Sequence, residues 1–316
     1  MLPNLIYLLT VMKNFSEPIL IVGTGALATL FAARLSAAGV DVCMLGSWQV
    51  GLDALEKDGA RLTLRDGREL VERVRAVSDP STLGRVRLAL VLVKAWQTEQ
   101  AALRLAKCLA DDGLALSLQN GLGNRETLAR FLGAERVGVG VTTIGATLLG
   151  PGRAALRGDG PVSIEAHPRL GALESCLNGA GFHVDIVHDA SSLLWSKLMV
   201  NAAINPLTAL LRAPNGALLE RPQARALMHE LARETTAVAH ALGIPLPFDD
   251  AISVAESVAR QTAENHSSML QDRQRGVQTE IDAICGAVVR AGERVGVATP
   301  VNRMMWQLLT AIGDSW

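Results

Sequence analysis

The sequence predicts an α/β protein, with an N-terminal doubly wound parallel sheet and a C-terminal all-helical domain. Two observations predict this fold. Short apolar runs typical of buried parallel strands alternate with helical segments in the first part of the chain. After residue 188 no strand pattern remains, and apolar residues recur at the helical period. We therefore expect one domain over residues 1–188, with residues 1–17 as an N-terminal extension, and a second over residues 189–316.

Composition excludes several classes of protein. At about 150 residues per domain, a length of 316 residues predicts two domains. The near balance of 30 basic and 31 acidic residues leaves no basic surface for nucleic acid. With 19% charged residues the chain is not a disordered one. No uncharged stretch reaches the about 20 apolar residues that a membrane-spanning helix needs.

The cysteines and the N-terminus indicate the compartment. The four cysteines fit neither a metal-ligand spacing nor a disulfide framework, so we expect buried reduced thiols, no metal and a cytoplasmic protein. The apolar N-terminus lacks the basic region and cleavage site of a signal peptide. We expect Met1–Val11 to be an upstream extension, with translation from Met12 as the alternative to Met1.

The predicted elements follow from apolar runs and from the glycines and prolines between them. The first helices are expected at residues 26–38 and 97–110, and residues 150–160 are expected to break the strand pattern. Strands are expected at residues 18–22, 40–45, 88–93, 114–118, 137–143, 162–165 and 183–187. Helices of the second domain are expected at residues 193–211, 217–242, 251–263, 277–295 and 301–312.

A glycine-rich loop follows the first predicted strand and opens the first predicted helix. Its first glycine permits a tight turn, its second lets the backbone approach a pyrophosphate, and its last position needs a small residue. The helix N-terminus beyond it offers N–H groups to phosphates. We therefore predict a Rossmann-type dinucleotide site; a tight turn without a ligand is the alternative. The loop consists of Gly23, Thr24, Gly25, Ala26, Leu27 and Ala28.

The end of the second strand usually distinguishes NAD from NADP. A carboxylate there binds the ribose 2′-hydroxyl, whereas an arginine favours the 2′-phosphate. This chain has Ser47 and Trp48 at that point and neither charged group. The local sequence therefore does not distinguish NAD from NADP as the cofactor.

Two lysines lie in apolar surroundings, in a chain that has only five lysines among its 30 basic residues. Lys94 follows a predicted strand, and Lys197 interrupts the apolar run from Leu193 to Met199. A desolvated lysine can lose its proton near neutral pH, whereas arginine cannot. We expect both lysines to serve chemistry; the alternative is a buried stem with an ion-paired or solvated ammonium.

Two asparagines extend the pattern around Lys197. Asn201 and Asn205 stand four and eight residues after it, so the three side chains share one stripe of a helix. Such a polar row in an apolar helix must meet polar partners, and a carbonyl-bearing ligand would meet that need. Asn205 also precedes Pro206, so it could instead cap a new helical turn.

A second polar group follows further along the chain. Ser268 and Gln271 have the spacing of a capping box that opens a helix, which would explain this serine without a ligand. Glu280 follows Val277 in an apolar pattern and could be a solvated helix charge. Periodicity alone does not decide between structure and function for either residue.

Taken together, these segments resemble the ketopantoate reductase family from Ile19 to about Gln307. The resemblance implies a two-domain NADPH-dependent enzyme that reduces 2-dehydropantoate to pantoate, a step of pantothenate biosynthesis. The motifs that carry it are GTGALA at Gly23, VKAWQT at Val93, QNGLGN at Gln119, TTIGA at Thr142, WSKLMVNAAINPLTAL at Trp195, SSMLQD at Ser267, TEID at Thr279 and ATP at Ala298.

The resemblance also implies roles for single residues. Lys197 would be the general acid and Glu280 a second essential polar group. Lys94 and Asn120 would lie beside the cofactor and orient its nicotinamide end. The substrate contacts would be Asn201, Asn205 and Ser268.

Departures from the family pattern and alternative functions stay open. Ser47 stands where the family usually has the arginine that binds the 2′-phosphate, so NADP(H) follows from resemblance and NAD(H) is not excluded. The chain could instead be a related 2-oxo acid or opine-type dehydrogenase with another substrate, or a nucleotide-sensing module without turnover. A sensor would not need Lys197, Asn201 and Glu280. Beyond a small-molecule substrate, a homodimer is the partner left open.

Overall fold

The computed structural model describes residues 18–313, so the expected extension and both start sites lie outside the described residues. The chain forms two compact units. The first holds residues 18–119 and Asn124–Ala190. The second holds Asn120–Gly123 and the residues from Ser191 onward.

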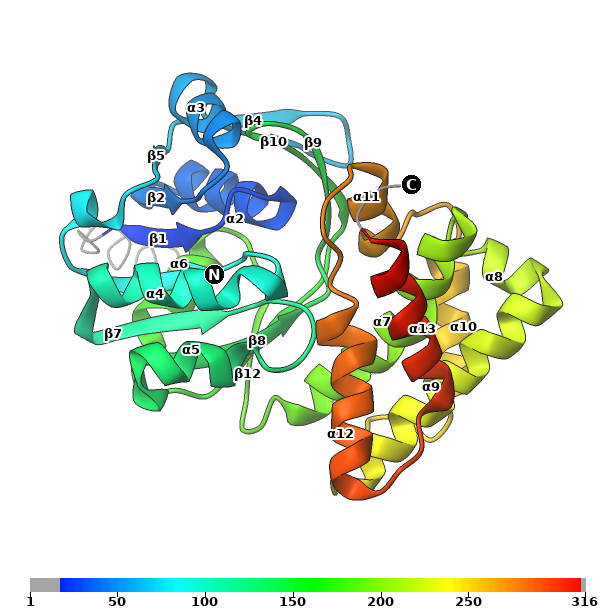
Figure 1. Ribbon diagram of the computed structural model, residues 1–316. Helices are drawn as coiled ribbons and strands as arrows, with labels where there is room; N and C mark the ends of the chain where they lie inside the picture. The colour runs from blue at the N-terminus through cyan, green and yellow to red at the C-terminus, as the bar shows by residue number, and fades with distance from the viewer. Residues whose placement is uncertain (1–17, 314–316) are drawn as a thin grey trace, which may run out of the picture. The chain divides into compact units, whose positions relative to one another are not determined.

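The first unit is built on an eight-stranded sheet (Figure 1). All neighbouring strands are parallel except β8 and β11, which are antiparallel. The predicted doubly wound α/β fold is thereby confirmed. In spatial order the strands are β12 (Val184–Val187), β11 (Val162–Glu165), β8 (Val137–Thr142), β7 (Leu109–Ser117), β6 (Val86–Val91), β1 (Ile19–Val22), β2 (Val42–Leu45) and β5 (Arg75–Val77).

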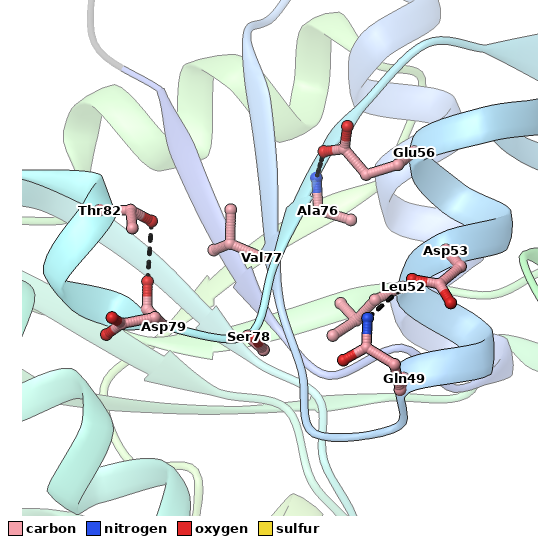
Figure 2. Close-up of a pocket in the computed structure, with 9 residues that line it drawn as sticks. All are labelled: Gln49, Leu52, Asp53, Glu56, Ala76, Val77, Ser78, Asp79 and Thr82. Carbon is pink, nitrogen blue, oxygen red and sulfur yellow. Dashed lines mark hydrogen bonds between the residues drawn. The ribbon is translucent and has the colours of Figure 1, made fainter.

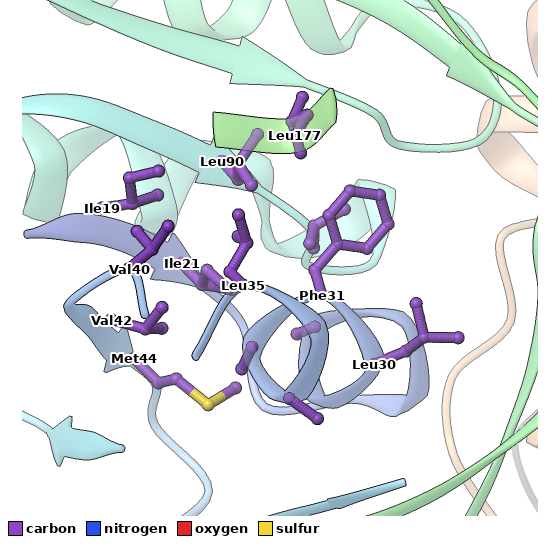
Figure 3. Close-up of a cluster of buried hydrophobic side chains, with 14 of the residues drawn as sticks. Ile19, Ile21, Leu30, Phe31, Leu35, Val40, Val42, Met44, Leu90 and Leu177 are labelled. Atoms are coloured by element: carbon purple, nitrogen blue, oxygen red, sulfur yellow. The ribbon is translucent and has the colours of Figure 1, made fainter. Parts of the chain in front are cut away.

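Helices cover both faces of this sheet. Ile19 and Ile21 of β1 pack in a core with α2 (Ala26–Ala37) and α6 (Gly171–Gly179) (Figure 3). Leu20 and Val22 of the same strand pack instead with α4 (Thr98–Cys108) and α5 (Asn124–Leu132). Because both faces of the central strands are buried, the sequence shows continuous apolar runs there rather than alternation.

A second, four-stranded sheet was not predicted. The segment expected to break the strand pattern in fact forms most of a hairpin, whose turn contains Gly152 with a φ of +66°. Leu62 and Leu156 of this sheet join the core around α2. Its strands are short and partly exposed, so they lack the buried apolar runs that indicated the main sheet. Their order is β4 (Glu69–Glu72), β3 (Ala60–Thr63), β10 (Arg153–Gly158) and β9 (Gly145–Gly150).

The regular secondary structure of the second unit, within its described residues, is all helical, as predicted (Figure 1). Helix α7 packs against α9, α10, α11 and α13, so it is apolar on nearly all sides. A π-helical turn, Asp282–Gly286, leads into α12. The helices are α7 (Ser191–Leu211), α8 (Ala217–Glu220), α9 (Pro222–Ala241), α10 (Ala251–Gln261), α11 (Ser268–Gln274), α12 (Ala287–Val295) and α13 (Pro300–Ile312).

Two of the predicted helices are wrong in extent. The pattern over residues 217–242 is interrupted at Arg221, because Pro222 starts a new helix. The pattern over residues 277–295 becomes helical only at Asp282, and Glu280 precedes it. Apolar periodicity continued across both breaks because the residues on either side are buried in the same core.

Cysteine burial agrees with the sequence analysis. All four cysteines are buried and none forms a disulfide. Burial raises the pKa of the Cys43 and Cys108 thiols to about 11, which keeps them protonated and unreactive. Across residues 18–313, no helix combines the length and the hydropathy needed to cross a bilayer.

Candidate active site

The glycine loop joins β1 to α2 between two neighbouring strands. Gly23 has a φ of +132°, and a Cβ there would lie 3.0 Å from the carbonyl oxygen of Leu92, just after β6. Its N–H donates to the carbonyl oxygen of Leu45 at the end of β2, at 2.8 Å. The first position of the loop therefore requires glycine for both its conformation and its close contact.

The start of α2 is open to an anion. Gly25 is its N-cap, no side chain caps the helix, and its first turn has no acidic residue. A Cβ on Gly25 would meet nothing within 4 Å. The first helical hydrogen bond runs from the Thr29 N–H to the Gly25 carbonyl at 2.9 Å, so the N–H groups of residues 26–28 have no partner within the helix. This arrangement fits the pyrophosphate of a dinucleotide.

Further residues of the loop pack against the core of the sheet unit or against Gly46. Ala28 is fully buried in the core, which requires a small side chain there, and Leu27 packs partly against the same core. The Thr24 side chain is buried against Gly46, where a Cβ would approach Thr24 Cγ2 to 2.6 Å. Ser47 follows Gly46 directly and is exposed.

A cavity of about 260 Å³ lies beside the end of β2 (Figure 2). It is lined by residues of α3 (Gln49–Asp58), the end of β5 and the turn around Pro80–Leu83. Leu52 in its wall also lies against Gly46. None of its nine lining residues is cationic, although Arg75 and Arg104 each donate to a backbone carbonyl of the lining. Its carboxylates are Asp53, Glu56 and Asp79.

The ends of β6 and β7 lie on the other side of the glycine loop. Lys94 follows β6 and is partly buried at the start of a short 3-10 turn. The side-chain amide of Gln119, after β7, donates to the Val93 carbonyl at 3.1 Å and to Thr98 Oγ1 at 2.8 Å. The sequence analysis missed Gln119 and Thr98, because single buried polar residues leave no periodic signal.

Asn120 lies in the helical unit, although Gln119 before it belongs to the sheet unit. Its Nδ2 donates to Glu280 Oε2 at 3.3 Å, and the Leu122 N–H donates to the Ala283 carbonyl at 3.1 Å. The structure therefore pairs Asn120, expected at the cofactor, with Glu280, expected at the reacting group.

Helix α7 carries the polar row that the sequence predicted. Lys197, Asn201 and Asn205 lie on one continuous helix, and Asn205 is 7% exposed. The alternative that Asn205 caps a new helical turn is wrong, because α7 continues through Pro206. The neighbouring helices hold this proline in the helix despite the hydrogen bond that it removes.

The capping box expected at Ser268 is also wrong. Ser267 is the N-cap of α11, and its Oγ accepts from the Leu270 N–H at 3.1 Å. The Gln271 amide donates to the carbonyl of His266 instead. Ser268 is therefore the first residue of the helix and has no capping role.

Tertiary packing determines which of the two adjacent serines caps α11. Thr208, three residues after Asn205 on α7, lies with its Oγ1 2.7 Å from Ser267 Oγ. Both residues are buried. This hydrogen bond fixes Ser267 as the cap and brings the start of α11, with Ser268, to the end of the polar row. The sequence analysis missed Thr208, although it continues the stripe of polar residues.

Lys197 and Glu280 are two charged residues that affect each other electrostatically. Burial lowers the pKa of Lys197 to about 8, and the Glu280 carboxylate opposes that shift. Glu280 is 5% exposed, so the alternative of a solvated helix charge is wrong. A lysine with this pKa can release a proton near neutral pH, which an ordinary surface lysine cannot do.

Comparison with known proteins identifies the family. The model of the family described as Ketopantoate reductase PanE/ApbA matches residues 19–169, and the model of its C-terminal part matches residues 189–313. The chain belongs to the ketopantoate reductase family. Membership in this family makes it a nicotinamide-dependent reductase, in agreement with the prediction from sequence.

Relatives match nearly the whole chain. A 2-dehydropantoate 2-reductase of Archaeoglobus fulgidus is 38% identical over 301 residues, covering 92% of this chain and 96% of that protein. One of Halobacterium salinarum is 32% identical over 296 residues, covering 92% and 97%.

Solved structures give the same family and a second activity. A PanE/ApbA family ketopantoate reductase from Ralstonia eutropha JMP134 has a TM-score of 0.88 at 33% identity, covering 94% of this chain and 99% of that one. A D-mandelate dehydrogenase with NADH and anilino(oxo)acetate has a TM-score of 0.87 at 26% identity, covering 93% and 98%.

Proposed function

We propose that this ketopantoate reductase family member reduces the C2 carbonyl of 2-dehydropantoate to the alcohol of pantoate. The observation that carries the proposal is the row of Lys197, Asn201 and Asn205 on α7, together with buried Glu280. The names of the relatives, given for 32–38% identity over more than nine tenths of the chain, support this substrate.

A nicotinamide cofactor would supply the hydride when bound. The N–H groups at the start of α2 would hold its pyrophosphate, with Gly23 and Gly25 keeping the backbone accessible. Ser47 would contact the ribose next to the pyrophosphate. The remaining residues proposed for the cofactor are Thr24, Ala26, Leu27, Ala28, Lys94 and Asn120.

Lys197 would act as the general acid. Its ammonium would donate a hydrogen bond to the C2 carbonyl oxygen, stabilise the negative charge that develops there, and transfer the proton that completes the hydroxyl. A pKa of about 8 suits this role, because the group is protonated at neutral pH yet releases its proton readily. General acid catalysis of this kind contributes about 10²- to 10⁴-fold to the rate.

Neutral donors and one acceptor would orient the substrate. Asn201, Asn205 and Ser268 would bind the carboxylate or a hydroxyl of the substrate. Glu280 would accept from a substrate hydroxyl and keep Lys197 protonated through its charge. Amide, hydroxyl and carboxylate groups can hydrogen-bond a polar substrate, so they favour a polar substrate over an apolar one.

In this proposal the enzyme uses both NADH and NADPH. Ser47 offers no positive charge to a 2′-phosphate, and the cavity beside it is lined by three carboxylates and no cation among its nine residues. The D-mandelate dehydrogenase with a similar structure is described with NADH.

The reduced buried cysteines support a cytoplasmic location, to be tested by cell fractionation. A homodimer stays a prediction, to be tested by light scattering.

A second candidate is the reduction of another 2-oxo acid. The similarity to a D-mandelate dehydrogenase favours it, because that enzyme acts on a 2-hydroxy acid with an aromatic group. The same lysine and amides would serve either substrate, since both present a carboxylate next to the reacting carbonyl.

A substrate panel tests both candidates. The loss of absorbance at the reduced-nicotinamide band is followed with ketopantoate, pyruvate, 2-oxoisovalerate, oxaloacetate and benzoylformate, each with NADPH and with NADH. We expect ketopantoate to give the highest kcat/KM, by roughly tenfold or more. A higher value for benzoylformate would establish the second candidate. Tight cofactor binding without oxidation by any of the five acids would contradict both and indicate a sensing module.

A further inference from the structure

Within the helical unit, the loop Asn120–Gly123 lies against the carbonyl group of Ala283. Gly121 has a φ of +80°, and a Cβ built on it would lie 2.5 Å from the carbonyl oxygen of Ala283 and 2.7 Å from its Cβ. The next residue, Leu122, donates its N–H to the same oxygen at 3.1 Å. Any side chain at position 121 would push the loop away from Ala283.

Ala283 belongs to the π-helical turn that begins two residues after Glu280. The Gly286 N–H donates to the Ile281 carbonyl, and the Ile284 N–H donates to the carbonyl of Glu280 itself at 3.0 Å. The backbone of Glu280 is thus held by this turn. Helical turns of this type are rare and occur frequently at functional sites.

The same loop also holds the Glu280 side chain, through the 3.3 Å hydrogen bond from Asn120 Nδ2 to Oε2. The charge of this carboxylate acts on the Lys197 ammonium and favours its protonated form. Asp282, on the same turn, is exposed and paired with Arg290 at 2.9 Å. Glu280 therefore has its backbone held by the turn and its side chain held by the loop.

We propose that Gly121 is a positioning residue for the reaction. Its missing side chain lets Asn120–Gly123 lie on the turn Asp282–Gly286, and this contact holds the Glu280 carboxylate in place against Lys197. The proposal rests on the proposed function only in taking Lys197 as the proton donor.

Substitution of Gly121 should change the proton affinity of Lys197. In Gly121→Ala the loop moves off Ala283, Asn120 releases Glu280, and the carboxylate no longer opposes the effect of burial. We expect the pKa of Lys197 to fall below about 8, by roughly one unit or tenfold in proton affinity. Glu280→Gln should produce a fall of the same sign, because it removes the carboxylate charge.

The measurement uses the full chain without cofactor or substrate. With only five lysines in the sequence, labelling lysine with ¹³C at Cε gives few NMR signals, and Lys197→Arg identifies the one from Lys197. A pH titration of that signal gives its pKa in the parent protein, in Gly121→Ala, in Glu280→Gln and in the double variant. We expect the double variant to show no larger fall than Glu280→Gln alone, since both changes remove one interaction.

Gly123→Ala is the matched control. Gly123 has a φ of +90°, but a Cβ there would meet nothing within 4 Å. It carries the same backbone strain without the collision, so the Lys197 titration should be unchanged. If Gly121→Ala does not fold, Asn120→Ala tests the same interaction, with a fall of the same sign.

Two outcomes overturn the proposal. One is a Lys197 titration that Gly121→Ala leaves unchanged while Glu280→Gln lowers it, since Glu280 would then not depend on the loop. The other is a titration that Glu280→Gln does not move at all. Neither result depends on turnover, so failure of the proposed function on the substrate panel is a separate outcome. In an active enzyme, the alkaline limb of kcat/KM should move to lower pH with the titration.

Discussion

The glycine loop and the polar row of α7 are two sites built in different ways. In the proposed function the loop would bind the cofactor through its backbone: its essential features are a φ of +132° at Gly23, open space above Gly25 and N–H groups at a helix start that have no partner within the helix. The row would bind the substrate through side chains: Lys197, Asn201 and Asn205 repeat on one helix, and residues distant in sequence lie beside them. A backbone site depends on a few consecutive residues, whereas a side-chain site depends on packing.

This difference predicts how the two sites fail. Changes in the loop should weaken cofactor binding and leave the Lys197 ammonium as it is. Changes in the row should reduce the chemical step and leave cofactor binding intact. Lys197→Ala and Gly23→Ala each change one site, and the other site serves as the reference.

The largest effect is expected for Lys197→Ala. Removing the proton donor should lower kcat by about 10²- to 10⁴-fold, while the Kd for the reduced cofactor, measured by its fluorescence, stays within about twofold. Lys107→Ala, at an exposed position of α4, should leave both quantities unchanged. A Lys197→Ala enzyme that retained most of its turnover would rule out the assigned role.

Gly23→Ala should weaken cofactor binding at the glycine loop. The new Cβ meets the Leu92 carbonyl in a conformation that alanine avoids, with a strain of about 1–3 kcal/mol. The Kd for the cofactor should rise roughly tenfold or more, with the Lys197 titration unchanged. Gly39→Ala also has a positive φ, of +81°, but open space around it, and it should not affect the Kd. Equal effects of both variants would mean that strain alone matters.

The pH dependence of turnover sharpens the assignment of the row. Burial lowers the pKa of Lys197 to about 8, and the donor must be protonated for reduction. The kcat/KM for reduction should therefore be level below about pH 8 and fall about tenfold per pH unit above it. Oxidation of the alcohol needs the neutral amine, so kcat/KM for oxidation should rise with pH up to about 8 and be level above it. A reduction profile that is flat up to pH 10 would contradict proton donation by Lys197.

Ser47→Arg tests the ribose end of the loop site. A guanidinium there would offer charge-assisted hydrogen bonds to a 2′-phosphate, so the ratio of kcat/KM for NADPH over NADH should rise roughly tenfold. Ser47→Ala serves as the control and should leave the ratio near that of the parent. An unchanged ratio in Ser47→Arg would place the ribose contact elsewhere.

The smallest effect separates the two adjacent serines. Ser267→Ala removes the cap of α11 and the contact with Thr208, so the free energy of unfolding should fall by about 1 kcal/mol. Ser268→Ala should leave stability nearly unchanged and raise KM for the 2-oxo acid. Chemical denaturation and steady-state kinetics on both variants measure this, and the reverse assignment of effects would restore Ser268 as the cap.

Much of the fold could be predicted because each signal was local. Strand β1 is buried along its whole length and β6 from Leu88 to Val91, so the apolar runs there are continuous. The smaller sheet escaped prediction because β4 is half exposed and β9 lies among glycines. The break at Pro222 and the late start of the helix at Asp282 were missed because residues on both sides share one core.

The candidate site, like the fold, could be predicted only where the signal lay within a few consecutive turns of the chain. The spacing from Lys197 to Asn205 was visible because one helix carries all three side chains. The burial of Glu280, the choice of Ser267 over Ser268, and the pairing of Asn120 with Glu280 were not visible. These depend on residues more than 50 positions apart, for which a single sequence offers no spacing rule.

By itself the sequence determined the doubly wound sheet, the open loop after its first strand and the polar stripe of α7, because periodicity and glycine chemistry act over a few residues. Tertiary structure alone decided the protonation of that stripe. Burial of Lys197 and the opposing Glu280 carboxylate set its pKa near 8, and a proton's affinity depends on every charge and every desolvated surface around it. No run of neighbouring residues contains that information.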